Sequence, residues 1–121
     1  MFLHKWGGSL TIGNNVGMSS PTIWCDEKIV IGNDVRIGAL VTIMDTDCHS
    51  LNYKDRMNGD KGTKTKPVVI EEGVLIGAQS IVLKGSHIGA HSVIGAGSVV
   101  CGEIPANCIA AGNPCKVIRK L

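Results

Sequence analysis

Residues 70–105 read I-E-E-G-V-L, I-G-A-Q-S-I, V-L-K-G-S-H, I-G-A-H-S-V, I-G-A-G-S-V and V-C-G-E-I-P, and an aliphatic residue begins each group of six. These aliphatic positions are Ile70, Ile76, Val82, Ile88, Ile94 and Val100. A period of six is a multiple of two and not of 3.6, so it indicates short extended segments separated by turns and fits no helix. Three such segments would close one triangular coil of a β-solenoid.

The same period occurs upstream at Ile31, Ile37 and Ile43, and more loosely at Ile12. From Ile43 to Ile70 the interval is 27 residues, where the repeat would give six, so the polar segment 45–67 is expected to be looped out of the coil. The chain has 16 Gly and only two Trp, one Tyr and one Phe, which suits a narrow interior filled by β-branched side chains. We therefore predict an all-β fold, a parallel β-helix, as one domain over residues 1–121. Either the chain is a minimal solenoid of this kind or it lacks N-terminal coils.

The charge, hydropathy and cysteine content of the sequence argue against several classes of protein. The formal net charge of +2 is too small to indicate nucleic-acid binding, and the basic residues do not alternate with aromatic ones. The sequence contains no apolar run long enough to span a membrane, and no apolar segment follows Met1, so a cytoplasmic protein is expected. The five cysteines form no C-x-x-C pair, which predicts free thiols and no structural zinc site. The exposed ends and side face of a short solenoid predict a homo-oligomer.

The looped-out segment begins with D-T-D-C-H-S at residues 45–50, which places a histidine and two carboxylates where the coil ends. Histidine exchanges protons near neutral pH, so His49 is the leading candidate for a general base. The alternative is that His49 is a solvated surface residue. Cys48 precedes it, but adjacent side chains of an extended segment point to opposite sides, so we assign Cys48 no chemical role.

Two other groups of polar residues have simpler interpretations. His87 and His91 have metal-ligand spacing only if they lie on a helix, and in hexapeptides they are expected to be exposed at the corners of the prism. Lys116, Arg119 and Lys120 form a basic C-terminal cluster. Such a cluster is either a solvated face or a binding site for phosphate esters.

The repeats, the D-T-D-C-H-S segment, V-I-G-A-G-S-V-V at 93–100 and A-G-N-P-C-K-V-I-R-K at 111–120 together resemble the hexapeptide-repeat acyltransferases. The most similar branch is that of the sugar and polysaccharide O-acetyltransferases of the maltose, galactoside and nodulation type. The resemblance implies a left-handed β-helix, a homotrimer with active sites between subunits, and acetyl transfer from acetyl-CoA to a sugar or glycan hydroxyl. It implies no metal.

By the same resemblance, His49 corresponds to the base that removes the proton from the acceptor hydroxyl, whose oxygen then attacks the thioester directly. Asp47, or less favourably Asp45, would hold the imidazole in the correct tautomer. The backbone of Ala78 would donate to the thioester oxygen.

The remaining implied contacts concern the cofactor. Ala96 would contact the pantetheine arm, and Lys116 and Arg119 would bind the phosphates of the nucleotide. The resemblance thus favours ligand binding over a solvated face for the basic cluster.

Two hypotheses from other classes remain beside this one. The first is a non-catalytic trimeric hexapeptide scaffold. The second is a zinc hydratase of the γ-carbonic anhydrase type, which would need His49, His87 and His91 to converge on one metal ion.

Overall fold

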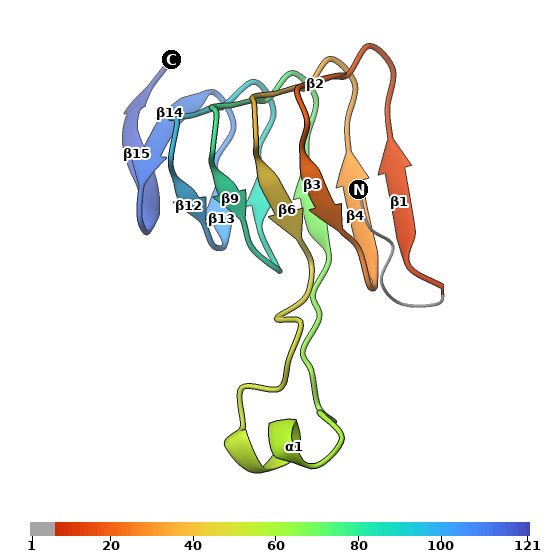
Figure 1. Ribbon diagram of the computed structural model, residues 1–121. Coiled ribbons are helices and arrows are strands. Elements are labelled where there is room, and N and C mark those ends of the chain that lie inside the picture. The colour runs from red at the N-terminus through yellow and green to blue at the C-terminus, as the bar shows by residue number, and fades with distance from the viewer. Residues whose placement is uncertain (1–6) are drawn as a thin grey trace.

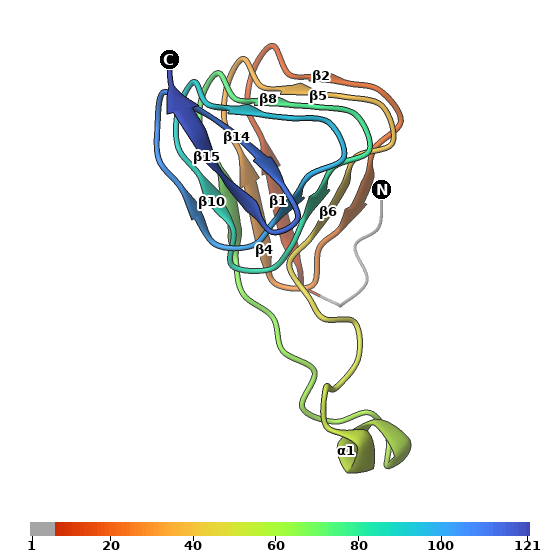
Figure 2. The same cartoon turned by 90° about the vertical axis from the view of Figure 1, so that its left-hand side faces the viewer.

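In the computed structural model, which describes residues 7–121, the chain winds through about five turns of a solenoid with a triangular cross-section (Figures 1 and 2). Figure 2 looks at the C-terminal end, and there the chain passes clockwise around the triangle as it approaches the viewer. Such a coil is left-handed, so the predicted left-handed parallel β-helix is confirmed, although crossovers between parallel strands are normally right-handed. The predicted domain over residues 1–121 includes residues 1–6, which lie outside the described range.

One side of the prism is a five-stranded parallel sheet. Its register aligns Ile31, Ile70, Ile88 and Ile104, so that one aliphatic side chain from each turn lies above the next. The strand order is β1 (Ser9–Ile12), β4 (Lys28–Ile31), β7 (Val68–Ile70), β10 (His87–Ile88) and β13 (Glu103–Ile104).

The second side is a six-stranded sheet in which only the last pair is antiparallel. There β15 folds back on β14, and the register shifts between Ile109 and Ala110, a β-bulge. The strand order is β15 (Cys115–Lys120), β14 (Cys108–Gly112), β11 (Val93–Ile94), β8 (Leu75–Ile76), β5 (Arg36–Ile37) and β2 (Gly17–Met18).

The third side is a four-stranded parallel sheet, which joins the other two at the remaining edges of the prism (Figure 2). Its register aligns Ile43 with Val82 and Val82 with Val100. The strand order is β12 (Val99–Val100), β9 (Ile81–Val82), β6 (Thr42–Met44) and β3 (Thr22–Trp24).

The interior is filled by the aliphatic residues of the repeat. The six positions from Ile70 to Val100 that define the period are all at most 1% exposed. Burial of such a side chain contributes about 1.5–3 kcal/mol each, so the repeat itself is the main source of stability.

Besides the aliphatic residues, two further features recur every six residues at the corners of the prism: a left-handed backbone conformation and a buried serine. One residue per corner has a left-handed backbone conformation, as at Gly73, Gln79, Gly85, His91 and Gly97. Buried serine hydroxyls then bind backbone carbonyls of the corners: Ser80 and Ser98 bind Gly95, Ser86 binds Leu83 and Val100, and Ser92 binds Pro105. These hydrogen bonds satisfy turn carbonyls that would otherwise be buried without a partner.

Residues 45–67 leave the prism as a projecting arm, as the interval in the repeat predicts (Figures 1 and 2). Near its tip lies α1 (Tyr53–Met57), whose N-cap Asn52 accepts a hydrogen bond from the backbone N–H of Asp55. None of the side chains of α1 is buried. Within the described residues, no helix has the length and hydropathy needed to cross a membrane.

Candidate functional site

The foot of the arm is fixed to the turns of the prism before and after it. The carboxylate of Asp45 is fully buried and accepts backbone N–H groups from Asp26, Glu27 and Lys28 at 2.7–2.8 Å. Asp47 Oδ1 lies 3.0 Å from Lys84 Nζ. Because Asp45 binds the preceding corner and Asp47 the following one, the arm begins from a rigid base.

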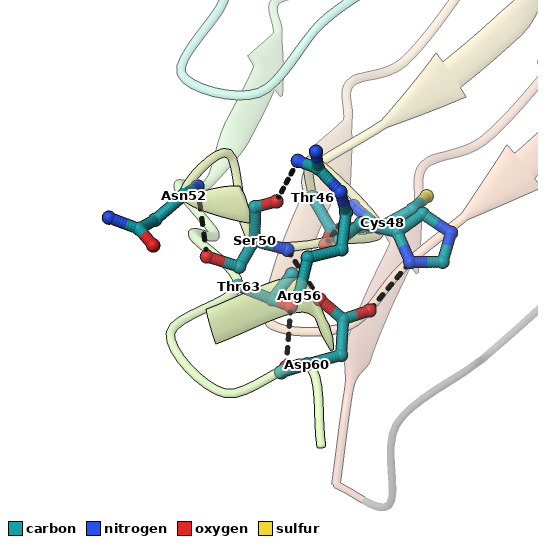
Figure 3. Close-up of polar contacts among 8 residues, drawn as sticks. Thr46, Cys48, Ser50, Asn52, Arg56, Asp60 and Thr63 are labelled. Atoms are coloured by element: carbon teal, nitrogen blue, oxygen red, sulfur yellow. Dashed lines mark hydrogen bonds and ion pairs between the residues drawn. The ribbon is translucent and has the colours of Figure 1, made fainter. Parts of the chain in front are cut away.

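His49 lies on this arm, with a side chain that is 69% exposed. Its Nδ1 is 2.6 Å from Oδ2 of Asp60 (Figure 3). Asp47, the partner expected from the sequence, binds Lys84 instead. The left-handed conformation of Cys48, with φ of 66°, turns the chain between Asp47 and His49. The pairing of Asp47 or Asp45 with the imidazole is therefore replaced by a pairing with Asp60.

Cys48 is not activated as a nucleophile. Burial raises the pKa of the Cys48 thiol, and the negative charges of Asp26, Asp47 and Asp45 raise it further. A raised pKa reduces the thiolate fraction at neutral pH, which is the reactive form.

A different edge of the prism, here called the alanine edge, is formed by residues 38–41, 77–80 and 95–98, where the six-stranded sheet passes into the four-stranded one. The carbonyl of Ala78 accepts the N–H of Gly97 at 2.9 Å, which stacks the turn of Ala78 on that of Ala96. A Cβ on Gly77 would lie 2.5 Å from the backbone N of Ala96, so the two turns are in close contact. Within residues 7–121, the N–H groups of Ala78 and Ala96 donate to no acceptor.

The β-bulge in the last strand pair brings the two predicted phosphate-binding residues to one face. Lys116 pairs with Ala111 and Arg119 with Ile109, and these partners are the outward-facing residues of β14. Without the bulge, residues three apart on a strand would point to opposite faces. Ala111 lies against Gly95, so the basic pair continues the line of the alanine edge.

One chain does not bring all of these residues together. The arm leaves from the edge between the four-stranded and five-stranded sheets, opposite the six-stranded sheet (Figure 2). The strands of the four-stranded sheet therefore separate the foot of the arm from Ala78, Ala96 and the basic pair. Within the described residues of one chain, His49 and this group therefore lie on different edges of the prism.

The other two histidines bind carboxylates on the prism. The ring of His87, on strand β10 rather than at a corner, contacts Glu71 and lies 3.4 Å from Glu103, and His91, at a corner, lies 3.5 Å from Glu72. Within the described part of the chain, no three metal-ligating side chains form a cluster. The convergence of His49, His87 and His91 that a zinc hydratase requires is therefore not seen in one chain.

Sequence reasoning missed Asp60. The residue follows Asn58 and Gly59, and an Asn-Gly pair is typical of turns. A turn does indicate that the chain reverses, but it does not specify which residue at the turn or after it meets His49. The buried serines were also missed, although their spacing of six, at residues 80, 86, 92 and 98, was visible in the sequence.

Comparison with known proteins gives two relatives that share most of this chain. A galactoside O-acetyltransferase of Escherichia coli (strain K12) is 38% identical over 118 residues, which cover 97% of this chain and 57% of that protein. A galactoside O-acetyltransferase of Lactococcus lactis is 47% identical over 100 residues, which cover 83% of this chain and 47% of that protein. The chain thus spans about half the length of these relatives.

Structure and family comparison agree with the sequence comparison. A hexapeptide-repeat acetyltransferase of Vibrio cholerae, solved in complex with acetyl-CoA, superposes with a TM-score of 0.85 and 33% identity, over 93% of this chain and 60% of that one. Residues 67–102 match the family described as bacterial transferase hexapeptide (six repeats). With its period of six, its left-handed coil and these relatives, the chain belongs to the hexapeptide-repeat transferase family.

Proposed function

We propose that this chain is an acetyl-CoA-dependent O-acetyltransferase whose acceptor is a hydroxyl group of a sugar or a surface-polysaccharide precursor. The observation that carries the proposal is the hydrogen bonding of the His49 ring. Its Nδ1 is bound by a carboxylate, and its Nε2 has no partner among residues 7–121. An imidazole held in this way has one nitrogen available to take a proton. The chain that carries it is a relative of galactoside O-acetyltransferases.

The proposed reaction needs one base and an oxyanion donor. His49 Nε2 removes the proton of the acceptor hydroxyl, and the oxygen attacks the thioester carbonyl. The backbone N–H of Ala78 donates to the developing oxyanion. Collapse of the tetrahedral intermediate forms the ester and releases the CoA thiolate, which takes the proton from His49.

The proposed cofactor site is the alanine edge. Ala96 lies on the adjoining turn, where its N–H is available to an amide of the pantetheine arm. Lys116 and Arg119 are exposed on one face at the end of this line, and neither forms an ion pair with a carboxylate of the described residues. Two unpaired cations on one face suit the phosphates of CoA.

We propose a homotrimer with each site between two subunits, in which one chain supplies His49 and the next supplies the alanine edge. Two observations support it: the separation of these groups within one chain, and exposed apolar side chains beside the alanine edge. Leu40, Leu75 and Ile81 are 61%, 44% and 37% exposed there. A neighbouring copy would remove these side chains from water.

The first experiment is calorimetric titration of the protein with acetyl-CoA and with CoA, followed by thiol release with a panel of sugar acceptors. We expect about one binding site per subunit, and turnover that falls about 100- to 10,000-fold in His49→Ala while acetyl-CoA binding persists. The matched control is His91→Ala, which removes an exposed histidine from a corner of the prism and should leave turnover unchanged.

These measurements distinguish the acetyltransferase from the non-catalytic scaffold. Full turnover in His49→Ala would remove this residue from the mechanism. A folded oligomer that binds neither acetyl-CoA nor CoA would favour the non-catalytic scaffold instead.

A further inference from the structure

The carboxylate of Asp60 contacts two parts of the arm at once. Oδ2 lies 2.6 Å from Nδ1 of His49, and Oδ1 accepts the backbone N–H of Ser50 at 2.7 Å (Figure 3). One side chain thus binds both the histidine ring and the backbone that follows it. Two contacts of this kind fix the position and the rotation of the ring relative to its own backbone.

The charge of Asp60 determines the tautomer of the ring. The hydrogen bond from the Ser50 N–H lowers the pKa of the Asp60 carboxyl, and the hydrogen bond from His49 lowers it further. An ionised carboxylate only accepts hydrogen bonds, so Nδ1 of His49 must carry a proton and donate it. The lone pair of the neutral ring is then on Nε2.

The rest of the arm holds this pair in place. Arg56, on α1, donates from Nη1 to the carbonyl of Ser50 at 2.9 Å, on the side of Ser50 opposite to Asp60 (Figure 3). The hydroxyl of Ser50 accepts the backbone N–H of Asn52, the N-cap of α1, at 3.2 Å. The side chain of Thr63 binds the carbonyl of Asp60 at 3.4 Å. The helix and the returning part of the arm therefore both hold the carboxylate and the histidine in place.

We infer that Asp60 is the positioning residue of the candidate base: it fixes the His49 ring with Nε2 unprotonated, and Arg56 supports it by holding Ser50. The inference rests on the proposed role of His49 in acetyl transfer. Asp60 does not touch the substrate in this proposal; it acts through the ring. The charge of Arg56 acts on Asp60 and helps to lower the pKa of its carboxyl, after the hydrogen bonds from Ser50 and His49, whereas Asp47 is bound to Lys84.

The test is the protonation of the two ring nitrogens of His49, measured by ¹⁵N NMR on the full chain without substrate. In the unmodified protein we expect the proton of the neutral ring on Nδ1. In Asp60→Asn, the proton should move to Nε2 in most molecules, because no anion then holds the proton on Nδ1. The matched control is Asp55→Asn, which removes one exposed carboxylate from α1 of the same arm and should leave the tautomer unchanged.

Steady-state kinetics of acetyl transfer provide a second test of the role of Asp60. Asp60→Asn should lower kcat for acetyl transfer about tenfold or more while KM for acetyl-CoA changes little. Asp60→Glu, which keeps the charge on a longer side chain, should retain the tautomer and part of the rate. A proton on Nε2 in the unmodified protein, or a tautomer unaffected by Asp60→Asn, would overturn the inference. Loss of turnover in His49→Ala tests the proposed function separately, so the two failures are distinguishable.

Discussion

At the scale of the residue, Asp45 shows how a side chain next to a candidate site can serve the scaffold. Its carboxylate is fully buried and accepts three backbone N–H groups from residues 26–28. Burial raises the pKa of the Cys25 thiol to about 11, and the negative charge of Asp45 is the next largest cause. The carboxylate therefore fixes the corner from which the arm leaves and has no oxygen turned to the imidazole.

Asp45→Asn should lower the free energy of unfolding by about 2–4 kcal/mol, because hydrogen bonds to a buried charge are strong and the amide group would face N–H donors. The measurement is urea unfolding followed by circular dichroism. In the control Asp47→Asn, the lost partner is the partly exposed Lys84, and the expected loss is about 1 kcal/mol or less. Equal losses in the two variants would argue against the buried role of Asp45.

At the scale of the element, the arm has few buried apolar groups, and its order depends on polar contacts such as those of Asp60. The pKa of Asp60 in the folded arm is lowered from the model-peptide value of 3.8. A group with a lowered pKa in the folded state stabilises that state above its unfolded pKa, and the stabilisation is lost as pH falls through the folded pKa.

The arm should therefore lose order below about pH 4 while the prism remains folded. The measurement is the hydrogen-exchange protection factor of the Ser50 amide, whose N–H binds Asp60, taken relative to the intrinsic exchange rate at each pH. The amide of Leu75, which donates to Ser92 within the prism, provides the internal reference. In Asp60→Asn the protection factor should no longer depend on pH in this range. A protection factor at Ser50 that is the same at pH 7 and pH 3 in the unmodified protein would contradict this expectation.

The alanine edge is the second element with a testable role. Gly77→Ala would place a Cβ 2.5 Å from the backbone N of Ala96, so the stacked turns must move apart. We expect a destabilisation of about 1–3 kcal/mol and a clearly weaker binding of acetyl-CoA in calorimetry.

The control for Gly77→Ala is Gly89→Ala, whose Cβ would lie 2.4 Å from the backbone N of Ala106 at a different edge. It should destabilise the protein by a similar amount and leave the affinity for acetyl-CoA unchanged. If both variants weaken binding equally, the cofactor does not lie along the alanine edge.

At the scale of the whole molecule, the arm and the alanine edge lie on different edges of the prism, and the proposed site combines these two parts from two copies. Mixed oligomers of two inactive variants test this arrangement. One variant carries His49→Ala and the other carries Lys116→Ala with Arg119→Ala. If each site combines His49 of one subunit with the alanine edge of the next, some mixed sites contain both intact halves.

Refolding the two variants together at equal concentration should restore about a quarter of the wild-type activity, since random assembly gives that fraction of intact sites. Each variant refolded alone should stay near its own low rate. Failure of the mixture to exceed the mean of the two variants, in oligomers shown by mass spectrometry to be mixed, would place the whole site within one chain.

The sequence by itself determined the prism and the place of the arm. The period of six specifies which residue of each segment is buried and where the chain turns, and both properties depend on neighbours in the sequence. For that reason the parallel strands of the regular repeats, their inward aliphatic residues and the excursion after Ile43 were predictable. The longest break in the period also placed His49 on the projecting segment.

Only the tertiary structure decided which groups meet. Asp60 rather than Asp47 reaches His49, because a left-handed residue at Cys48 and the return of the arm set that contact. The bulge opposite Ile109 places Lys116 and Arg119 on one face, which a strict alternation would not predict. These pairings depend on local backbone angles and on strands that are distant in sequence, and no period in the sequence records either of them.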